Sequence, residues 1–242
     1  MDMSDLAAQS ITYSDLTIAS TRAVVDASLR GGVHYLPGTK KEVEQIRDIL
    51  QPNHITAKVY TSEAANEESF KALSGKKQNI LHIATHGFYW SDSTARAQRY
   101  FSDGFATPEN TTEGLDPLRR SGLLFAGANI ALRGHGNALP ANVQDGILTS
   151  KEISLLDLRG ADMVILSACE TGKGEITGEG VFGLQRAFKM AGAQTMLMSL
   201  WPVDDEATQM MMSSFYRHWI TRRETKRDAF IHAQNEVKQQ YP

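Results

Sequence analysis

Three stretches of the sequence end in side chains that can do nucleophilic chemistry. The run "ILHIATHG" ends at His86 and Gly87, "VILSAC" ends at Cys169, and "LMSLWPVDD" ends at Asp204 and Asp205. A thiol becomes a nucleophile when a nearby base or cation supplies the thiolate, because free cysteine has a pKa of about 8.5. His86 is the natural base for Cys169. These residue types predict covalent catalysis by a cysteine if the three stretches end side by side.

Attack on a carbonyl also requires donors for the oxyanion that develops. The backbone N–H groups of Gly87 and Cys169 are the candidates, because glycine lets the backbone approach a substrate without side-chain obstruction. Cys169 is the only cysteine of the chain. On spacing alone, a single cysteine at a strand end is more often a small buried hydrophobic residue than a nucleophile.

Two further histidines and a glycine-rich loop have plainer interpretations. His82 lies on the same face of its strand as His86 but deeper, which is typical of a hydrogen-bonded core histidine. His135, in "LRGHGNALP", is interpreted as a turn residue. The loop "TGKGEITGEG" is no phosphate loop, because Gly174 stands where Ser or Thr must follow Lys173. A nucleotide-binding protein is therefore the weakest hypothesis.

Four apolar runs followed by turn residues predict strands that position these side chains. They are nearly continuous rather than alternating, as in parallel strands covered on both faces. The runs are "GVHYLPG", "NILHIATHG", "DMVILSACETG" and "TMLMSLWPVDD". Amphipathic patterns predict helices over 38–50, capped by Thr39, and over 62–73, 178–192 and 204–220. The alternation predicts an α/β fold, in which the carboxyl ends of the strands share one crevice.

Composition excludes several classes of function. The 242 residues are 41% hydrophobic and 22% charged, with a formal net charge of −3, so neither nucleic acid nor a membrane is expected as a partner. The basic run 217–227 is interpreted as a solvated helix face. One cysteine excludes a disulfide framework and a multi-cysteine zinc site, and no metal or cofactor is expected. With no signal peptide and no long apolar run, the sequence predicts a cytoplasmic protein.

Four blocks of sequence resemble the CHAT domain, a bacterial caspase-like module often found after tetratricopeptide repeats. They lie in family order between Tyr35 and Tyr216: "YLPGTKKEVEQI", "LHIATHGFY", "SGLLFAGAN" with "DGILTSKEISLLDLRGADMVILSACETGKGE", and "GEGVFGLQRAFKMAGAQTMLMSLWPVDDEAT". The family belongs to the group of cysteine peptidases that includes caspases, gingipains and separase. The resemblance implies a caspase-like three-layer α/β/α sandwich with a mostly parallel central sheet.

The resemblance also implies a catalytic dyad and the partners of a regulated peptidase. His86 matches the family's general acid and base, Cys169 matches the nucleophile, and the amides of Gly87 and Cys169 match the oxyanion hole. The expected substrate is a protein or peptide, and an attached repeat region or an activator protein is the expected regulator. The alternative hypothesis is a non-catalytic domain of the same fold that binds a peptide or a partner protein.

One acidic segment bears on substrate preference. "SLWPVDDEAT" resembles the separase segment in which an acidic residue faces a basic P1 side chain, so Asp205, or less well Asp204, is the candidate for the pocket. In the competing interpretation both carboxylates begin a helix, where they stabilise exposed N–H groups. If the pocket accepts basic residues, Arg119 and Arg120 in the long polar segment 88–120 are a candidate self-processing site.

The resemblance assigns residues 31–242 to the CHAT domain and leaves residues 1–30 as an N-terminal segment of open packing. Two departures from the family pattern stand out. No repeat region precedes the domain, and the chain ends at "NEVKQQYP", where the family continues into a further strand. We therefore expect the sheet to lack its last family strand, as in a piece of a longer protein.

Overall fold

A parallel sheet of five strands forms the centre of the molecule. The computed structural model of the chain describes residues 16–21, 33, 37–89, 117–119, 121–132, 143–167, 178–199 and 205–241. The parallel strands are β1 (Leu16–Thr21), β2 (Ala57–Thr61), β3 (Ile80–Tyr89), β6 (Met163–Leu166) and β7 (Thr195–Met198). They lie side by side in the order β2-β1-β3-β6-β7.

Two antiparallel strands extend the sheet from the second half of β3. These are β4 (Ser121–Leu124) and β5 (Ile147–Thr149). β3 pairs with β1 over residues 80–85 and with β6 over residues 80–83, and then pairs with β4 from His86 to Tyr89. The central strand therefore belongs to two pairing patterns, and the change between them falls at His86.

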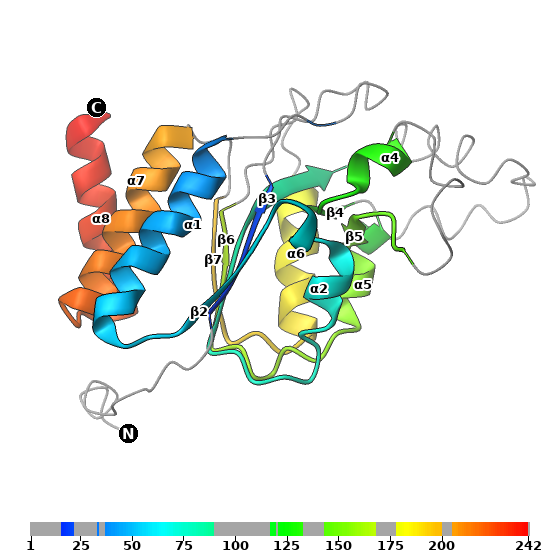
Figure 1. Cartoon of the computed structure of the whole chain (residues 1–242), viewed down its shortest axis with the longest axis horizontal. Helices are drawn as coiled ribbons and strands as arrows, with labels where there is room; N and C mark the ends of the chain where they lie inside the picture. The colour runs from blue at the N-terminus through cyan, green and yellow to red at the C-terminus, as the bar shows by residue number, and fades with distance from the viewer. Residues whose placement is uncertain are drawn as a thin grey trace, which may run out of the picture.

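Helices cover both faces of the parallel sheet (Figure 1). One face carries α1 (Pro37–Leu50), α7 (Asp205–Tyr216), the π-helical turn η8 (Arg217–Thr221) and α8 (Lys226–Gln240). The opposite face carries α2 (Glu67–Lys71), α5 (Ser150–Ser154) and α6 (Gly178–Met190). Shorter elements are η3 (Gln51–Asn53), η4 (Ser62–Ala64), η6 (Pro117–Arg119) and α4 (Ala128–Leu132). This arrangement confirms the predicted three-layer α/β/α sandwich with a mostly parallel sheet.

Two large apolar cores fill the spaces between the layers, and a smaller cluster lies around Phe88, Leu124 and Ala128. Leu81 and Ile83 of β3 pack with the α2, α5 and α6 side, whereas Ile80 and Ala84 pack with the α1, α7 and α8 side. Successive strand residues point to opposite faces, so a strand buried on both sides must be apolar throughout. This explains why the runs that form β3, β6 and β7 are continuous in the sequence.

The structure corrects two local predictions near α1. The helix begins at Pro37, so Thr39 lies buried inside its first turn and is not the cap. Proline suits the first helical position, because its fixed φ is helical and it has no N–H to leave unpaired. The strand predicted at residues 32–38 is accordingly wrong at its carboxyl end, where Pro37 and Gly38 are helical. Residues 34–36 lie outside the described residues.

Candidate active site

His86 lies where β3 leaves the parallel sheet and begins to pair with β4. Its side chain is buried, with 2% of the residue exposed, and its Cα is paired with that of Leu124. Gly87 follows on the same strand, opposite Leu123. Loops at the carboxyl edge of a parallel sheet converge on one crevice, which is where such folds bind ligands. The sequence placed His86 and Gly87 at the end of their strand, but β3 runs on to Tyr89, so His86 marks the end of the parallel pairing and not the end of the strand.

The neighbouring strand β6 leads toward the same edge. β6 pairs in parallel with β3, and the N–H of Ser167 donates to the carbonyl of Ile83 at 2.9 Å. Ser167 is the last described residue of this stretch, and Cys169 follows it by two positions in the sequence. Cys169 itself lies outside the described residues, as do Asp204, His135 and Arg120.

The structure describes three of the other predicted sites only in part. Asp205 is the first residue of α7, the helix start that its competing interpretation requires, but its side chain is outside the described residues. Arg119 is an exposed residue in the short helical turn η6. Within the basic run, Arg217 and Arg222 are exposed, but His218, Trp219 and Ile220 are buried. The solvated-face prediction is therefore right only for part of that run.

A buried polar network lies beneath His86. His82 is fully buried, and its Nε2 donates to Glu42 Oε1 at 2.8 Å while its Nδ1 accepts from the hydroxyl of Tyr216 at 3.2 Å. The second oxygen of Glu42 accepts from Ser167 Oγ at 3.0 Å. This confirms His82 as a hydrogen-bonded core histidine. Complete burial, assisted by the charge of Glu42, raises the pKa of Tyr216 well above its usual value.

This network joins α1 to β3 and to the residue that follows β6. Glu42 comes from α1, His82 from β3, and Ser167 directly follows β6, in the stretch that continues to Cys169. A carboxylate with two buried donors fixes both strands against the helix, because leaving either donor unpaired inside the protein is costly. Sequence reasoning missed Glu42 and Ser167. The one available signal was a charged residue, Glu42, on the otherwise apolar stripe of its helix.

The β4–β5 pair supports His86 from the other side. A Cβ atom at Gly122 would lie 2.3 Å from the carbonyl oxygen of Leu148 and 2.7 Å from the ring of Phe88. Only glycine fits at this position of β4. Its missing side chain lets Leu148 of β5 and Phe88 of β3 both pack closely against the strand. Thr85 also donates its hydroxyl to the carbonyl of Leu124. The backbone around His86 is thus fixed by strand pairing and close packing.

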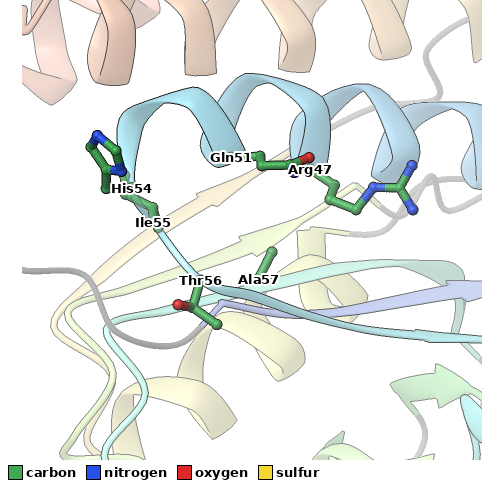
Figure 2. Close-up of a pocket in the computed structure, with 6 residues that line it drawn as sticks. All are labelled: Arg47, Gln51, His54, Ile55, Thr56 and Ala57. Carbon is green, nitrogen blue, oxygen red and sulfur yellow. The ribbon is translucent and has the colours of Figure 1, made fainter.

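The hollow in Figure 2 lies at the other end of the sheet. It adjoins the end of α1 and the residues that enter β2. Its lining residues are Arg47, Gln51, His54, Ile55, Thr56 and Ala57. Parallel strands begin at this end and finish at the edge that carries His86, so the hollow is separate from the candidate active site.

Comparison with known families decides the classification of the chain. The profile of the CHAT domain matches residues 4–241, which is nearly the whole sequence. The chain belongs to the CHAT family. This agrees with the three-layer fold. The matched region includes β1, which lies between β2 and β3.

Two curated relatives are both tetratricopeptide repeat protein 28. The human protein is 38% identical over 206 residues, which cover 80% of this chain and 7% of the relative. The mouse protein is 44% identical over 63 residues, which cover 26% of this chain and 3% of the relative. The chain therefore spans less than a tenth of the curated relatives that it matches. Their name denotes repeats and states no enzymatic activity.

Two solved structures show a weaker likeness. A flavodoxin of Streptococcus pneumonia TIGR4 is 11% identical with a TM-score of 0.39, covering 86% of this chain and 98% of the flavodoxin. A protein of Geobacter sulfurreducens is 12% identical with a TM-score of 0.44, covering 90% of this chain and 88% of that protein.

No helix within the described residues is both long and apolar enough to cross a bilayer.

Proposed function

We propose that this CHAT domain is a cysteine endopeptidase whose dyad is His86 and Cys169. The thiolate of Cys169 attacks the carbonyl carbon of a peptide bond, and the N–H groups of Gly87 and Cys169 hold the oxyanion. His86 donates a proton to the leaving amine, and an acyl-enzyme forms. A water molecule, deprotonated by His86, then releases the second product and restores the thiol.

One observation carries this proposal: His86 and the stretch before Cys169 come from adjacent parallel strands at one edge of the sheet. Ser167 is hydrogen bonded to Ile83, three residues before His86, and Cys169 is two residues after Ser167. Membership of the CHAT family supports the proposal, because the sequence resemblance aligns His86 and Cys169 with the dyad of that family.

The proposed partners follow from the same family. A protein or peptide is the substrate, and a repeat region or an activator protein regulates cleavage, in keeping with curated relatives that are named for tetratricopeptide repeats. Asp205, with Asp204 beside it, is proposed to line the pocket for a basic P1 side chain through a charge-assisted pair. We place the domain in the cytoplasm, where a single free cysteine stays reduced.

Thiol labelling tests the dyad without knowledge of the substrate or the activator. Iodoacetamide at neutral pH should modify Cys169 faster than free cysteine, and His86→Ala should reduce that rate to the free value. His54→Asn, which changes an exposed histidine at the other end of the sheet, is the matched control and should leave the rate unchanged. A thiol that reacts like free cysteine would favour the non-catalytic binding domain instead.

Peptide cleavage tests the reaction and the pocket. Cys169→Ala should abolish cleavage, and His86→Ala should lower kcat by roughly 10²- to 10⁴-fold, with thermal unfolding showing that both variants fold. Profiling on a peptide library should show a basic P1 preference that Asp205→Ala removes. Unchanged specificity in that variant would leave Asp205 only its role at the start of α7.

A further inference from the structure

Two histidines and a glutamate converge near the carboxyl end of the chain, close to the end of α1 and away from His86 (Figure 1). His218 belongs to the π-helical turn η8, Glu224 to the turn that follows it, and His232 to α8. His218 Nδ1 lies 2.8 Å from Glu224 Oε1, and His232 Nδ1 lies 2.7 Å from Glu224 Oε2. One donor atom from each of the three residues lies within 4.8 Å of the other two. Nδ1 of His218 and Nδ1 of His232 therefore both face the carboxylate of Glu224.

A second carboxylate orients the buried member of this cluster. The other ring nitrogen of His218, Nε2, lies 2.9 Å from Glu236 Oε1, and Ser214 donates its hydroxyl to Glu236 Oε2. Histidines that bind a metal through one nitrogen nearly always donate the other N–H to a carboxylate or carbonyl, which fixes the ring and strengthens its basicity. Glu236 and Ser214 supply this second layer.

The local backbone brings these side chains together. Widening of the helix at η8 accompanies the burial of His218, whose side chain is only 4% exposed. Arg223 adopts a left-handed φ of 57°, and the N–H of Glu224 then donates to the carbonyl of His218 at 3.2 Å. The chain thus folds Glu224 back over His218. Single π-helical turns inside helices are rare and often mark functional positions.

We propose that His218, Glu224 and His232 bind a divalent cation of the zinc type. Two imidazole nitrogens with one carboxylate oxygen select Zn²⁺ over Mg²⁺ and Ca²⁺, which prefer oxygen ligands alone. Three protein ligands leave a fourth position open, and it faces solvent on the side of His232, whose side chain is 52% exposed. Binding requires neutral imidazoles, so the ion releases the protons that the rings donate to Glu224.

The charges around the cluster accommodate a cation. Glu224 and Glu236 together bring two carboxylates, and the basic group Arg222 has its Nη1 3.4 Å from both ring nitrogens of His218. Arg222 is an exposed residue, so its guanidinium can move into solvent when the ion arrives. A bound ion would link η8 and the following turn to α8.

Metal titration of the intact chain tests the proposal. Isothermal titration should show one Zn²⁺ site that His232→Gln abolishes and that His54→Asn, a matched change of an exposed histidine, leaves intact. Zn²⁺ should raise the thermal unfolding midpoint of the native protein, and Mg²⁺ at the same concentration should not. Zinc binding that survives in His232→Gln would overturn the site, as would an equal response to both ions.

Two further measurements separate this site from the proposed dyad. Co²⁺ bound by nitrogen and oxygen gives a visible spectrum without a thiolate charge-transfer band, and the spectrum should persist in Cys169→Ala. Glu236→Gln should weaken zinc binding by about 10- to 100-fold, as other substitutions in the second layer do. A thiolate band, or full affinity in Glu236→Gln, would contradict the assignment and leave the dyad proposal untouched.

Discussion

Glu42 is the residue at which the buried hydrogen bonds beneath His86 meet. Its two oxygens accept hydrogen bonds from His82 of β3 and from Ser167, which follows β6. A carboxylate that is 1% exposed keeps its place only if these donors remain, because it has lost its water. The positions of β3 and of the residue that follows β6 therefore depend on one side chain of α1.

We expect a graded loss of stability when the donors of Glu42 are removed. His82→Ala should cost about 2–5 kcal/mol in unfolding free energy, because it removes a buried ring and leaves the carboxylate of Glu42 without one of its two donors. Ser167→Ala should cost about 1–3 kcal/mol, because only one oxygen is left unpaired. Urea denaturation measures both. His54→Asn is the exposed control, and a Ser167→Ala value equal to it would argue against the second hydrogen bond.

Asp157 offers a pH measurement at the same scale. Hydrogen bonds from the guanidinium and the N–H of Arg159, together with its positive charge, lower the pKa of Asp157 to about 2. The pair therefore stabilises the fold above the ordinary carboxyl pKa, and this contribution disappears as pH falls through about 2. Carboxyl NMR shifts should show this titration, and Arg159→Ala should return the pKa to its usual range.

At the scale of elements, the β4–β5 pair depends on a glycine. Gly122→Ala should destabilise the protein by about 1–3 kcal/mol, the usual cost of overpacking, because the new methyl group collides with the backbone of β5. The same substitution should slow the labelling of Cys169, since Phe88 and His86 share that part of β3. Gly75→Ala strains the backbone at a positive φ without bringing the new Cβ against another part of the chain, so a similar loss of labelling there would contradict this account.

The sequence predicted the elements that are buried on both faces and missed the shorter or more polar ones. β3, β6 and β7 were found because a strand covered on both sides is apolar throughout. β1, "LTIAST", contains three hydroxyl residues although it is an inner strand. β4 and β5 have four and three residues, too few to establish a period.

The candidate site was likewise predicted only in part. His86 was predicted from its place at the end of an apolar run, a property of the local sequence, although the strand itself continues to Tyr89. The network below it was not, because Glu42 is 40 residues from His82 and 125 residues from Ser167. Pairs of polar residues brought together by tertiary structure have no periodic pattern. The cluster of His218, Glu224 and His232 was missed for this reason, and its spacing matches no familiar metal motif.

At the scale of the whole molecule, the first thirty residues supply an inner strand. β1 pairs with β2 on one side and with β3 on the other, and no other described strand joins those two. A protein that begins at residue 31 should therefore fail to fold cooperatively, as measured by circular dichroism and thermal unfolding. Removal of residues 1–3, which precede the family match, is the control and should leave the transition unchanged. A cooperative transition in the longer deletion would show that β1 is dispensable.

The strands that pair with β3 are synthesised at different times. β1 and β2 are complete before β3 is made, but β6 begins at Met163, 74 residues after β3 ends at Tyr89. At roughly 5–20 residues per second, the ribosome needs about 4–15 s to make that interval. Throughout this time the edge of β3 from Ile80 to Ile83 has unpaired backbone groups that another chain can occupy. Nascent chains of this domain are therefore most prone to aggregate between the synthesis of residues 89 and 163, so slower translation of this interval should increase aggregation.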